Sequence, residues 1–202
     1  GAWTGGGRSR VDASGEVGLR DGGEYSGLGA GRCAEAPWFS ELCREYGFYV
    51  IAEADLESHG VQDQYGGGTE KTFSQLAEDP AYREAVIDRS RRNVIRDKNQ
   101  CCVIFWSLGN ESGMGTNIEE AGRWVKQYDP TRLVHYESCH FQPEGHVKDE
   151  SMLDVESHMY ASTRQIDEYF AAPGEKKPFI QCEFVHAMGN GPGDHEDYEQ
   201  PG

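Results

Sequence analysis

Short apolar runs alternate along the chain with longer segments in which apolar residues recur every three or four positions. The compact runs predict strands at about residues 48–51, 103–106, 133–136, 153–160 and 178–180. The helical spacing predicts helices at about residues 37–46, 80–98, 116–128 and 162–170. Strands with nearly continuous apolar residues that alternate with helices are typical of a parallel sheet covered by helices. The pattern therefore predicts an α/β fold.

Residues 1–32 do not share this pattern. They contain 11 of the 26 glycines and few large apolar residues, with neither a helical nor a strand period. Such a composition buries too little apolar surface to form a core. We interpret residues 1–32 as a Gly-rich leader with little regular structure and residues 33–202 as the folded domain.

The charge of the chain excludes several classes of partner. The 19 Lys and Arg residues stand against 35 Asp and Glu residues, which gives a formal net charge of -16. A chain of this charge repels phosphate, so neither nucleic acid nor an anionic membrane surface is an expected partner. No apolar run reaches the roughly 18 residues that a membrane span requires.

The six cysteines show no CxxC spacing, and several of them lie inside apolar runs. A disulfide framework or a zinc site normally shows a denser or more regular spacing. The cysteines therefore predict buried free thiols in the reducing cytoplasm rather than disulfides or a zinc site.

Polar side chains follow four of the five predicted strands, at the point where each strand ends. The residues concerned are Glu57, His59, Glu111, Glu137, Glu183 and His186. The carboxyl ends of parallel strands meet at one edge of the sheet, which is where α/β folds place their chemistry. The segment 138–150 has no convincing helical pattern, so we interpret it as a loop beside an active site.

Glu111 and Glu183 are the strongest pair of candidate catalytic residues. About seventy residues, or roughly three βα units, separate them, and each follows an apolar strand. Two carboxylates that flank a bond are what glycoside hydrolysis needs, one as proton donor and one as nucleophile or base. Trp106 and the apolar run before Glu111 could raise the pKa of that acid. From spacing alone, a pair of ordinary exposed glutamates is an equally good interpretation.

Glu57 and His59 lie two residues apart and would share one face of an extended segment. Together with Glu111 they would supply two carboxylates and one imidazole, a set that suits Mg²⁺ or Mn²⁺ better than zinc. Taken alone, the two residues fit a surface pair better than a metal site. Tyr160 ends a predicted strand and could donate a hydrogen bond to a carboxylate, or simply lie at an interface.

Three long segments resemble a known family. They read ELCREYGFYVIAEADLESHG, VIFWSLGNESGMG and KPFIQCEFVHAMGNGPGDHEDY, in this order. They are similar to the catalytic barrel of glycoside hydrolase family 2, in particular to bacterial β-galactosidases, over about residues 38–200. The resemblance implies a (β/α)8 TIM barrel. It also implies a retaining enzyme that cleaves terminal β-galactosides such as lactose and, at full length, forms homo-oligomers.

The resemblance also implies roles for individual residues. In GNES, Glu111 matches the acid/base, and in CEFVHAMGN, Glu183 matches the nucleophile. Glu57 and His59, together with Glu111, match the Mg²⁺ ligands. The positions that match substrate-contacting or nucleophile-supporting residues are Asn110, Tyr160 and His186.

The resemblance extends to only part of the barrel. About strands three to seven are recognisable, so residues 33–202 are expected to form an incomplete TIM barrel. Two alternatives to a β-galactosidase remain open at this point. One is an inactive fragment or degenerate sugar-binding protein with the same fold. The other is a relative that acts on β-glucuronides or β-mannosides.

Overall fold

The computed structural model describes residues 27–30, 37–61 and 74–183. Within these ranges the strands form a four-stranded sheet, in the order β1-β2-β3-β4, and a two-stranded sheet of β5 and β6. Every pairing is parallel, which confirms the predicted α/β class. The strands are β1 Gly27–Ala30, β2 Tyr49–Glu53, β3 Val103–Ser107, β4 Leu133–His135, β5 Glu156–Met159 and β6 Phe179–Glu183.

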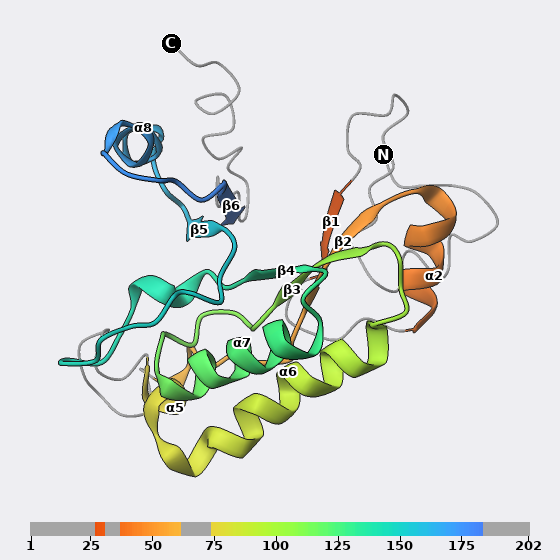
Figure 1. The fold of residues 1–202 in the computed structure, drawn as a ribbon, viewed down its shortest axis with the longest axis horizontal. Helices are drawn as coiled ribbons and strands as arrows, with labels where there is room; N and C mark the ends of the chain where they lie inside the picture. The colour runs from red at the N-terminus through yellow and green to blue at the C-terminus, as the bar shows by residue number, and fades with distance from the viewer. Residues whose placement is uncertain (1–26, 31–36, 62–73, 184–202) are drawn as a thin grey trace.

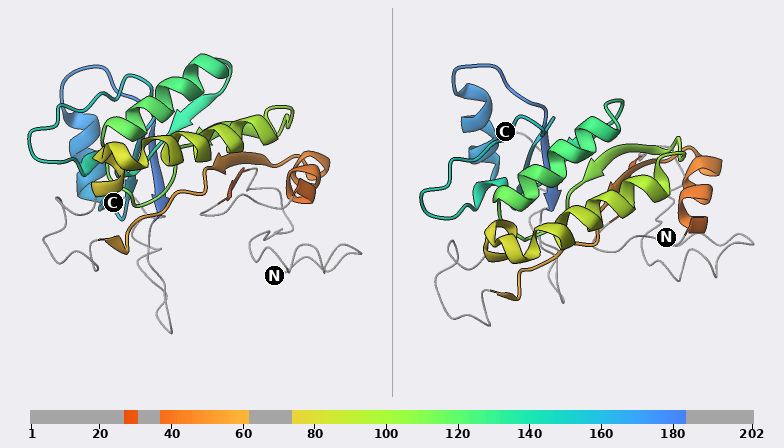
Figure 2. Two further views of the ribbon diagram at one scale, coloured as in Figure 1. Left: turned by 90° about the horizontal axis from the view of Figure 1, so that it is seen from below. Right: turned by 60° about the horizontal axis from the view of Figure 1, so that its bottom comes forward.

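Helices connect the strands in the manner of successive βα units. Figure 1 shows α6 and α7 side by side along one face of the four-stranded sheet, with α8 beyond β5. The right-hand view in Figure 2 shows the same two helices running beside each other in roughly the same direction. The helices are α2 Pro37–Tyr46, α5 Gln75–Glu78, α6 Arg83–Asp97, α7 Thr116–Tyr128 and α8 Thr163–Ala171, with 3-10 turns η1 Pro80–Tyr82 and η2 Ser138–His140. No described helix has the length and hydropathy of a membrane span.

Local sequence accounts for the ends of these helices. Pro37 is the first residue of α2, where its missing N–H has no partner to lose. Gly47 follows the helix with φ +76, a left-handed conformation that glycine adopts without strain. Ser162 and Gln165 form the predicted capping box at the start of α8, each side chain bonding the other's backbone.

The strand β1 lies inside the segment that the sequence predicted to be a leader. Gly27–Ala30 pairs in register with Tyr49–Ala52 of β2, so regular structure begins earlier than expected. The sequence GLGA has one large apolar residue and no alternation, which explains why the strand was missed. The rest of the predicted leader lies outside the described residues.

The core lies between the four-stranded sheet and its helices. Trp106 of β3, Val134 of β4 and Ile118 of α7 are fully buried there. Successive residues of a strand point to opposite faces, so Ser107 and His135 belong to the other face of the sheet. That face carries the polar groups described below.

The two sheets are joined at β4 and β5. The Asp154 carboxylate accepts a hydrogen bond from the Val134 N–H at 2.6 Å, and the Asp154 N–H donates to the Val134 carbonyl at 3.0 Å. These bonds place the start of β5 beside β4. Strands therefore follow one another in chain order around a partial α/β barrel.

The described cysteines all carry free thiols, as the sequence predicts. Cys43, Cys102 and Cys139 are buried, whereas Cys101 and Cys182 are exposed. The prediction of burial is therefore correct for three of the five.

Candidate active site

The segment after β3 reaches the neighbouring strand because of a glycine. Gly109 has φ +143, and a Cβ at this position would lie 2.8 Å from the carbonyl oxygen of Leu56. The next residue, Asn110, donates its N–H to that same carbonyl at 2.9 Å and forms a parallel bridge with Glu57. Glycine thus lets the end of β3 lie against the end of β2, which brings together polar residues about fifty positions apart.

Four predicted site residues meet at this contact. The side-chain amide of Asn110 donates to the Glu57 carboxylate at 2.7 Å and lies 3.4 Å from the Glu111 carboxylate. His59 Nδ1 lies 3.1 Å from Glu111 Oε2. The ligand atoms of Glu57, His59 and Glu111 all lie within 4.8 Å of one another. The three residues that the resemblance marks as metal ligands are therefore neighbours in space.

Glu111 is held in place by its backbone as well as by its side chain. Its φ is +39, a conformation that is uncommon outside glycine and that needs support from its surroundings. Support comes from Glu137, at the end of β4, whose carboxylate accepts the Glu111 N–H at 2.7 Å. The strained turn aims the Glu111 side chain toward His59 and Asn110 rather than along the strand.

The sequence did not predict that Glu137 supports the backbone of Glu111. The side chain is almost fully buried, and desolvation, together with the charges of Glu111 and Glu53, raises its pKa to about 7. Its hydrogen bonds from Ser138 and from the Glu111 N–H act in the opposite direction. The available signal was its place at the end of a strand, among the other carboxylates.

Trp106 does not contact Glu111 in the way that the sequence suggested. Its indole N–H donates to Asp129 at 2.9 Å, at the far end of α7, and Arg132 lies over its ring. Trp106 is a core residue on the helix face of β3. The partners of Glu111 include His59, Asn110 and Glu137.

A row of hydrogen bonds crosses the polar face of the strands. Ser107 donates to Glu53 at 3.0 Å, and the two ring nitrogens of His135 lie 2.9 Å from Ser107 Oγ and 2.8 Å from Ser157 Oγ. Burial lowers the pKa of His135 to about 4, so the ring is neutral at physiological pH. One ring nitrogen then donates and the other accepts, which links β3, β4 and β5 behind the candidate site.

Glu183 ends β6 and has its own partner. The Tyr160 hydroxyl donates a hydrogen bond to the Glu183 carboxylate, and the Tyr160 N–H donates to the Glu183 carbonyl at 2.7 Å. Tyr160 has φ +54, so its backbone turns sharply where β5 ends. The prediction that Tyr160 could bond a carboxylate is confirmed.

The predicted residues therefore form two groups, one at the end of each sheet. Glu111, Glu57, His59 and Asn110 belong to the first, and Glu183 with Tyr160 belongs to the second. Glu137 has an interaction with each side: it accepts the Glu111 N–H, and its negative charge adds to burial in raising the pKa of Cys182, the neighbour of Glu183. Desolvation, with the nearby carboxylates of Glu137 and Glu183, raises the pKa of the Cys182 thiol to about 11. His186 lies outside the described residues.

The segment 138–150, predicted to be a loop beside the site, contains only the short turn η2. Its Phe141 carbonyl accepts hydrogen bonds from the Met114 N–H at 2.5 Å and from the Ser74 hydroxyl at 2.9 Å. The loop thus packs against the glycine-rich segment that follows Glu111. It helps to fix the turn that carries this residue.

The family model "Glycosyl hydrolases family 2, TIM barrel domain" matches residues 27–201. The beta-galactosidase of Actinobacillus pleuropneumoniae is 47% identical over 82% of this chain and 18% of its own length. That of Staphylococcus xylosus is 39% identical over 88% of this chain and 18% of its own. The chain thus spans less than a fifth of these two relatives.

Solved structures agree on the fold. A beta-glucuronidase of Ruminococcus gnavus superposes with a TM-score of 0.60 at 18% identity, over 82% of this chain and 32% of that one. A beta-D-glucuronidase of Dictyoglomus thermophilum gives 0.57 at 23% identity, over 87% and 34%. Likeness at this identity concerns the fold alone. The chain belongs to glycosyl hydrolase family 2 and contains part of its TIM-barrel domain.

Proposed function

We propose that this chain is the catalytic part of a retaining β-galactosidase, which hydrolyses terminal β-D-galactose from β-galactosides such as lactose. The glycosidase activity rests on the family to which the chain belongs. The choice of galactose rests on the names of the relatives, which are beta-galactosidases at 39% and 47% identity.

In the proposed mechanism, Glu183 attacks the anomeric carbon while Glu111 gives a proton to the departing glycosidic oxygen. The sugar is then held on Glu183 as an ester, and the aglycone leaves as an alcohol. Glu111, now a carboxylate, removes a proton from water, which attacks the same carbon and releases galactose with its original configuration. Glu183 is regenerated as a carboxylate, so atoms and charges balance over the two steps.

The strongest support for this proposal is the position of the two carboxylates and of their partners. Each of the two carboxylates has a partner that suits its role, at the carboxyl end of a parallel strand where α/β barrels place their chemistry. Glu111 is fixed by the bond from its N–H to Glu137, and its carboxylate faces His59. Glu183 accepts a hydrogen bond from Tyr160, which stabilises a carboxylate in its ionised, nucleophilic form.

We further propose that Glu57, His59 and Glu111 hold Mg²⁺ or Mn²⁺. Two carboxylates and one imidazole form a mainly oxygen donor set, and the three side chains are partly open to solvent, so water can complete the shell. The ion would add positive charge beside Glu111. The protein's own contribution is to hold the three ligands, through the Asn110 amide on Glu57 and the turn at Glu111.

The test is a chimera: the A. pleuropneumoniae enzyme in which the matching segment is replaced by residues 27–201 of this chain. We expect the chimera to hydrolyse an aryl β-galactoside and to lose turnover on Glu183→Gln. The same panel includes an aryl β-glucuronide and an aryl β-mannoside. Faster turnover of either would contradict the galactoside assignment, and wild-type turnover by the Glu183→Gln chimera would remove Glu183 from the nucleophile role.

The 202-residue chain is assayed beside the chimera. Calorimetry measures galactose binding. If the chimera binds galactose but does not turn over the substrate, a sugar-binding protein is favoured over an enzyme. Activity of the chimera but not of the isolated chain would leave the assignment intact and show that the rest of the barrel is required.

A further inference from the structure

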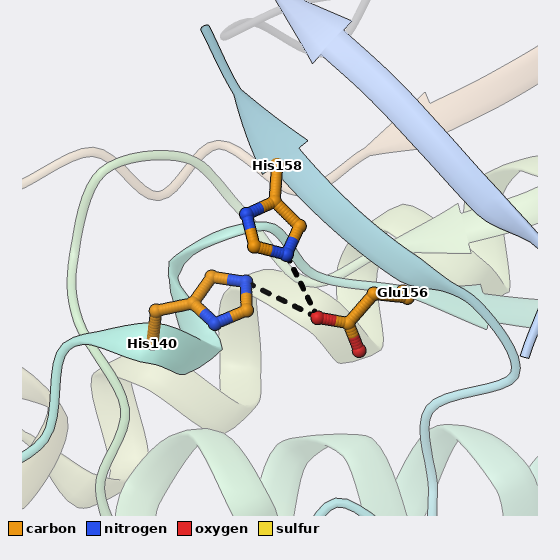
Figure 3. Close-up of side chains that lie close together, drawn as sticks. All are labelled: His140, Glu156 and His158. Atoms are coloured by element: carbon orange, nitrogen blue, oxygen red, sulfur yellow. Dashed lines mark hydrogen bonds and ion pairs between the residues drawn. The ribbon is translucent and has the colours of Figure 1, made fainter. Parts of the chain in front are cut away.

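A second cluster of side chains of the kinds that bind metals lies on the outer side of β5. Side chains alternate between the two faces of a strand, so Glu156 and His158 point away from the face that carries Ser157 and the candidate active site. His140, in η2, lies next to them. Figure 3 shows one nitrogen of each imidazole ring facing the same carboxylate oxygen of Glu156.

The distances suit a shared ion. His158 Nε2 lies 2.8 Å from Glu156 Oε1, and His140 Nε2 lies 3.6 Å from the same oxygen. All three ligand atoms lie within 4.8 Å of one another. Two donors bound tetrahedrally to one zinc ion are roughly 3.4 Å apart, given metal–ligand bonds of about 2.1 Å. The His158 and Glu156 ligand atoms would therefore have to separate by roughly 0.6 Å to bind one ion.

Packing holds the two rings in position. The ring centroids of His140 and His158 are 3.9 Å apart, and His158 stacks on Phe179 of β6 at 5.1 Å. Tyr169 of α8 packs on Phe179 in turn. The exposed fractions of the three ligand side chains lie between 21% and 31%, so an ion can reach the cluster from solvent.

We propose that His140, Glu156 and His158 bind a divalent transition-metal ion of the zinc class. Two imidazoles and one carboxylate form a nitrogen-rich set that suits Zn²⁺, Co²⁺ or Ni²⁺ and suits Mg²⁺ poorly. The proton in the His158–Glu156 hydrogen bond leaves when the ion binds. His140 binds through an unprotonated Nε2, so its hydrogen bond to the Ser157 carbonyl, now 3.1 Å long, is given up. Water takes the fourth position.

A bound ion would hold two separate parts of the fold together. It connects η2, which directly follows β4 and Glu137, to β5, which belongs to the other sheet. An ion that binds only the folded chain stabilises it by mass action. This inference does not depend on the proposed glycosidase activity, because the ligands lie on the face of β5 opposite to the catalytic candidates.

The experiment is a Co²⁺ titration of the whole 202-residue chain in excess Mg²⁺, which saturates sites made mainly of oxygen. Visible absorption of bound Co²⁺ reports four-coordinate geometry, and a near-ultraviolet thiolate band would reveal a cysteine ligand. The variants are Glu156→Gln, His158→Gln and His140→Gln. The controls are His59→Gln, from the cluster beside Glu111, and Glu144→Gln, an exposed carboxylate in the loop after η2.

We expect one saturable Co²⁺ site without a thiolate band, which Zn²⁺ displaces. Loss of a residue that only supports a metal ligand weakens metal binding roughly 10- to 100-fold. Each of the three ligand variants should weaken Co²⁺ binding by more than this. The two controls should bind as the wild type does, and Zn²⁺ should raise the melting temperature of the wild type and the controls only.

The proposal is overturned by any of three results: no saturable site in the wild type, unchanged affinity in both Glu156→Gln and His158→Gln, or loss of the site in His59→Gln. Far-UV circular dichroism without metal shows which variants keep the fold. If one ligand variant unfolds, the other two decide the outcome, because they remove different ligands of the same ion.

Discussion

The backbone N–H of Glu111 donates a 2.7 Å hydrogen bond to the buried carboxylate of Glu137. This bond crosses from the end of β3 to the end of β4 and supports a residue whose φ is +39. In its proposed role as general acid, Glu111 must present its proton in one direction, so its geometry matters as much as its chemistry. Glu137 is therefore a positioning residue, and its titration should affect both stability and activity.

Glu137→Gln should flatten the pH dependence of stability. The ordinary pKa of a glutamate, 4.5, approximates that of this carboxyl in the unfolded chain, and burial raises it to about 7 in the folded one. Between these values the folded chain holds a proton that the unfolded chain has released, so the free energy of unfolding falls as pH rises. The fall attributable to Glu137 is on the order of 3 kcal/mol.

Glutamine keeps an oxygen that accepts the Glu111 N–H but does not titrate. Urea unfolding of the wild type, Glu137→Gln and the exposed control Glu144→Gln at pH 5 and pH 7.5 tests this prediction. An equal pH slope in the wild type and in Glu137→Gln would contradict it.

Gly109→Ala should destabilise the chain more than an ordinary substitution at a positive φ. A methyl group at Gly109 would lie 2.8 Å from the Leu56 carbonyl and push apart the ends of β2 and β3. Gly145 is a matched control, because its φ is +80 and nothing lies within 4 Å of its Cβ position. We expect the unfolding free energy to fall by about 1 kcal/mol for Gly145→Ala and by several for Gly109→Ala. Equal losses would show that the close approach is unimportant.

Glu57→Gln should weaken the proposed Mg²⁺ site without altering the fold. The substitution replaces one of the two carboxylates that meet His59, and the Asn110 amide keeps an oxygen partner. In the chimera, we expect the Mg²⁺ concentration for half-maximal turnover to rise roughly tenfold or more. Asp55→Asn is the control, because Asp55 is exposed in the same segment and pairs with Arg89. The same increase in both variants would contradict a site at Glu57.

Tyr160→Phe should lower turnover by the chimera. It removes the hydroxyl that bonds Glu183 and keeps the ring and the backbone turn. A hydrogen bond to a charged group contributes about 1.5–3 kcal/mol, so kcat on an aryl β-galactoside should fall by roughly 10- to 100-fold. Tyr169→Phe also loses a hydroxyl, one that bonds the Lys177 carbonyl on the outer side. An equal loss of kcat in Tyr169→Phe would indicate a general effect of lost hydroxyls rather than support of Glu183.

The pattern of apolar residues alone predicted most of the described strands and helices, because β3 is a compact apolar run and the buried positions of α7 recur at helical spacing. The meeting of Glu57, His59 and Glu111 was also predictable, because parallel strands end at one edge of a sheet. The strand β1 was not, because four residues with one large apolar side chain give no period. The strand β1 forms because its backbone pairs with that of β2.

The burial of Glu137 and the direction of Trp106 were not predictable from composition. Glu137 bonds the Glu111 N–H and the Ser138 hydroxyl, and contacts of this kind leave no period in the sequence. The cluster at Glu156 and His158 was missed for a similar reason, since His140 reaches it only through the turn η2. Contacts between segments without regular structure depend on the whole fold.

The central claim is that Glu183 is the nucleophile, and covalent trapping tests it most directly. A 2-deoxy-2-fluoro-β-galactoside with a good leaving group slows the second step, so the sugar should accumulate on the chimera as an ester. Peptide mass spectrometry should find one sugar adduct, on Glu183, and none in the Glu183→Gln chimera. A sugar adduct on another residue, or release of α-galactose from a β-galactoside as followed by NMR, would contradict the account.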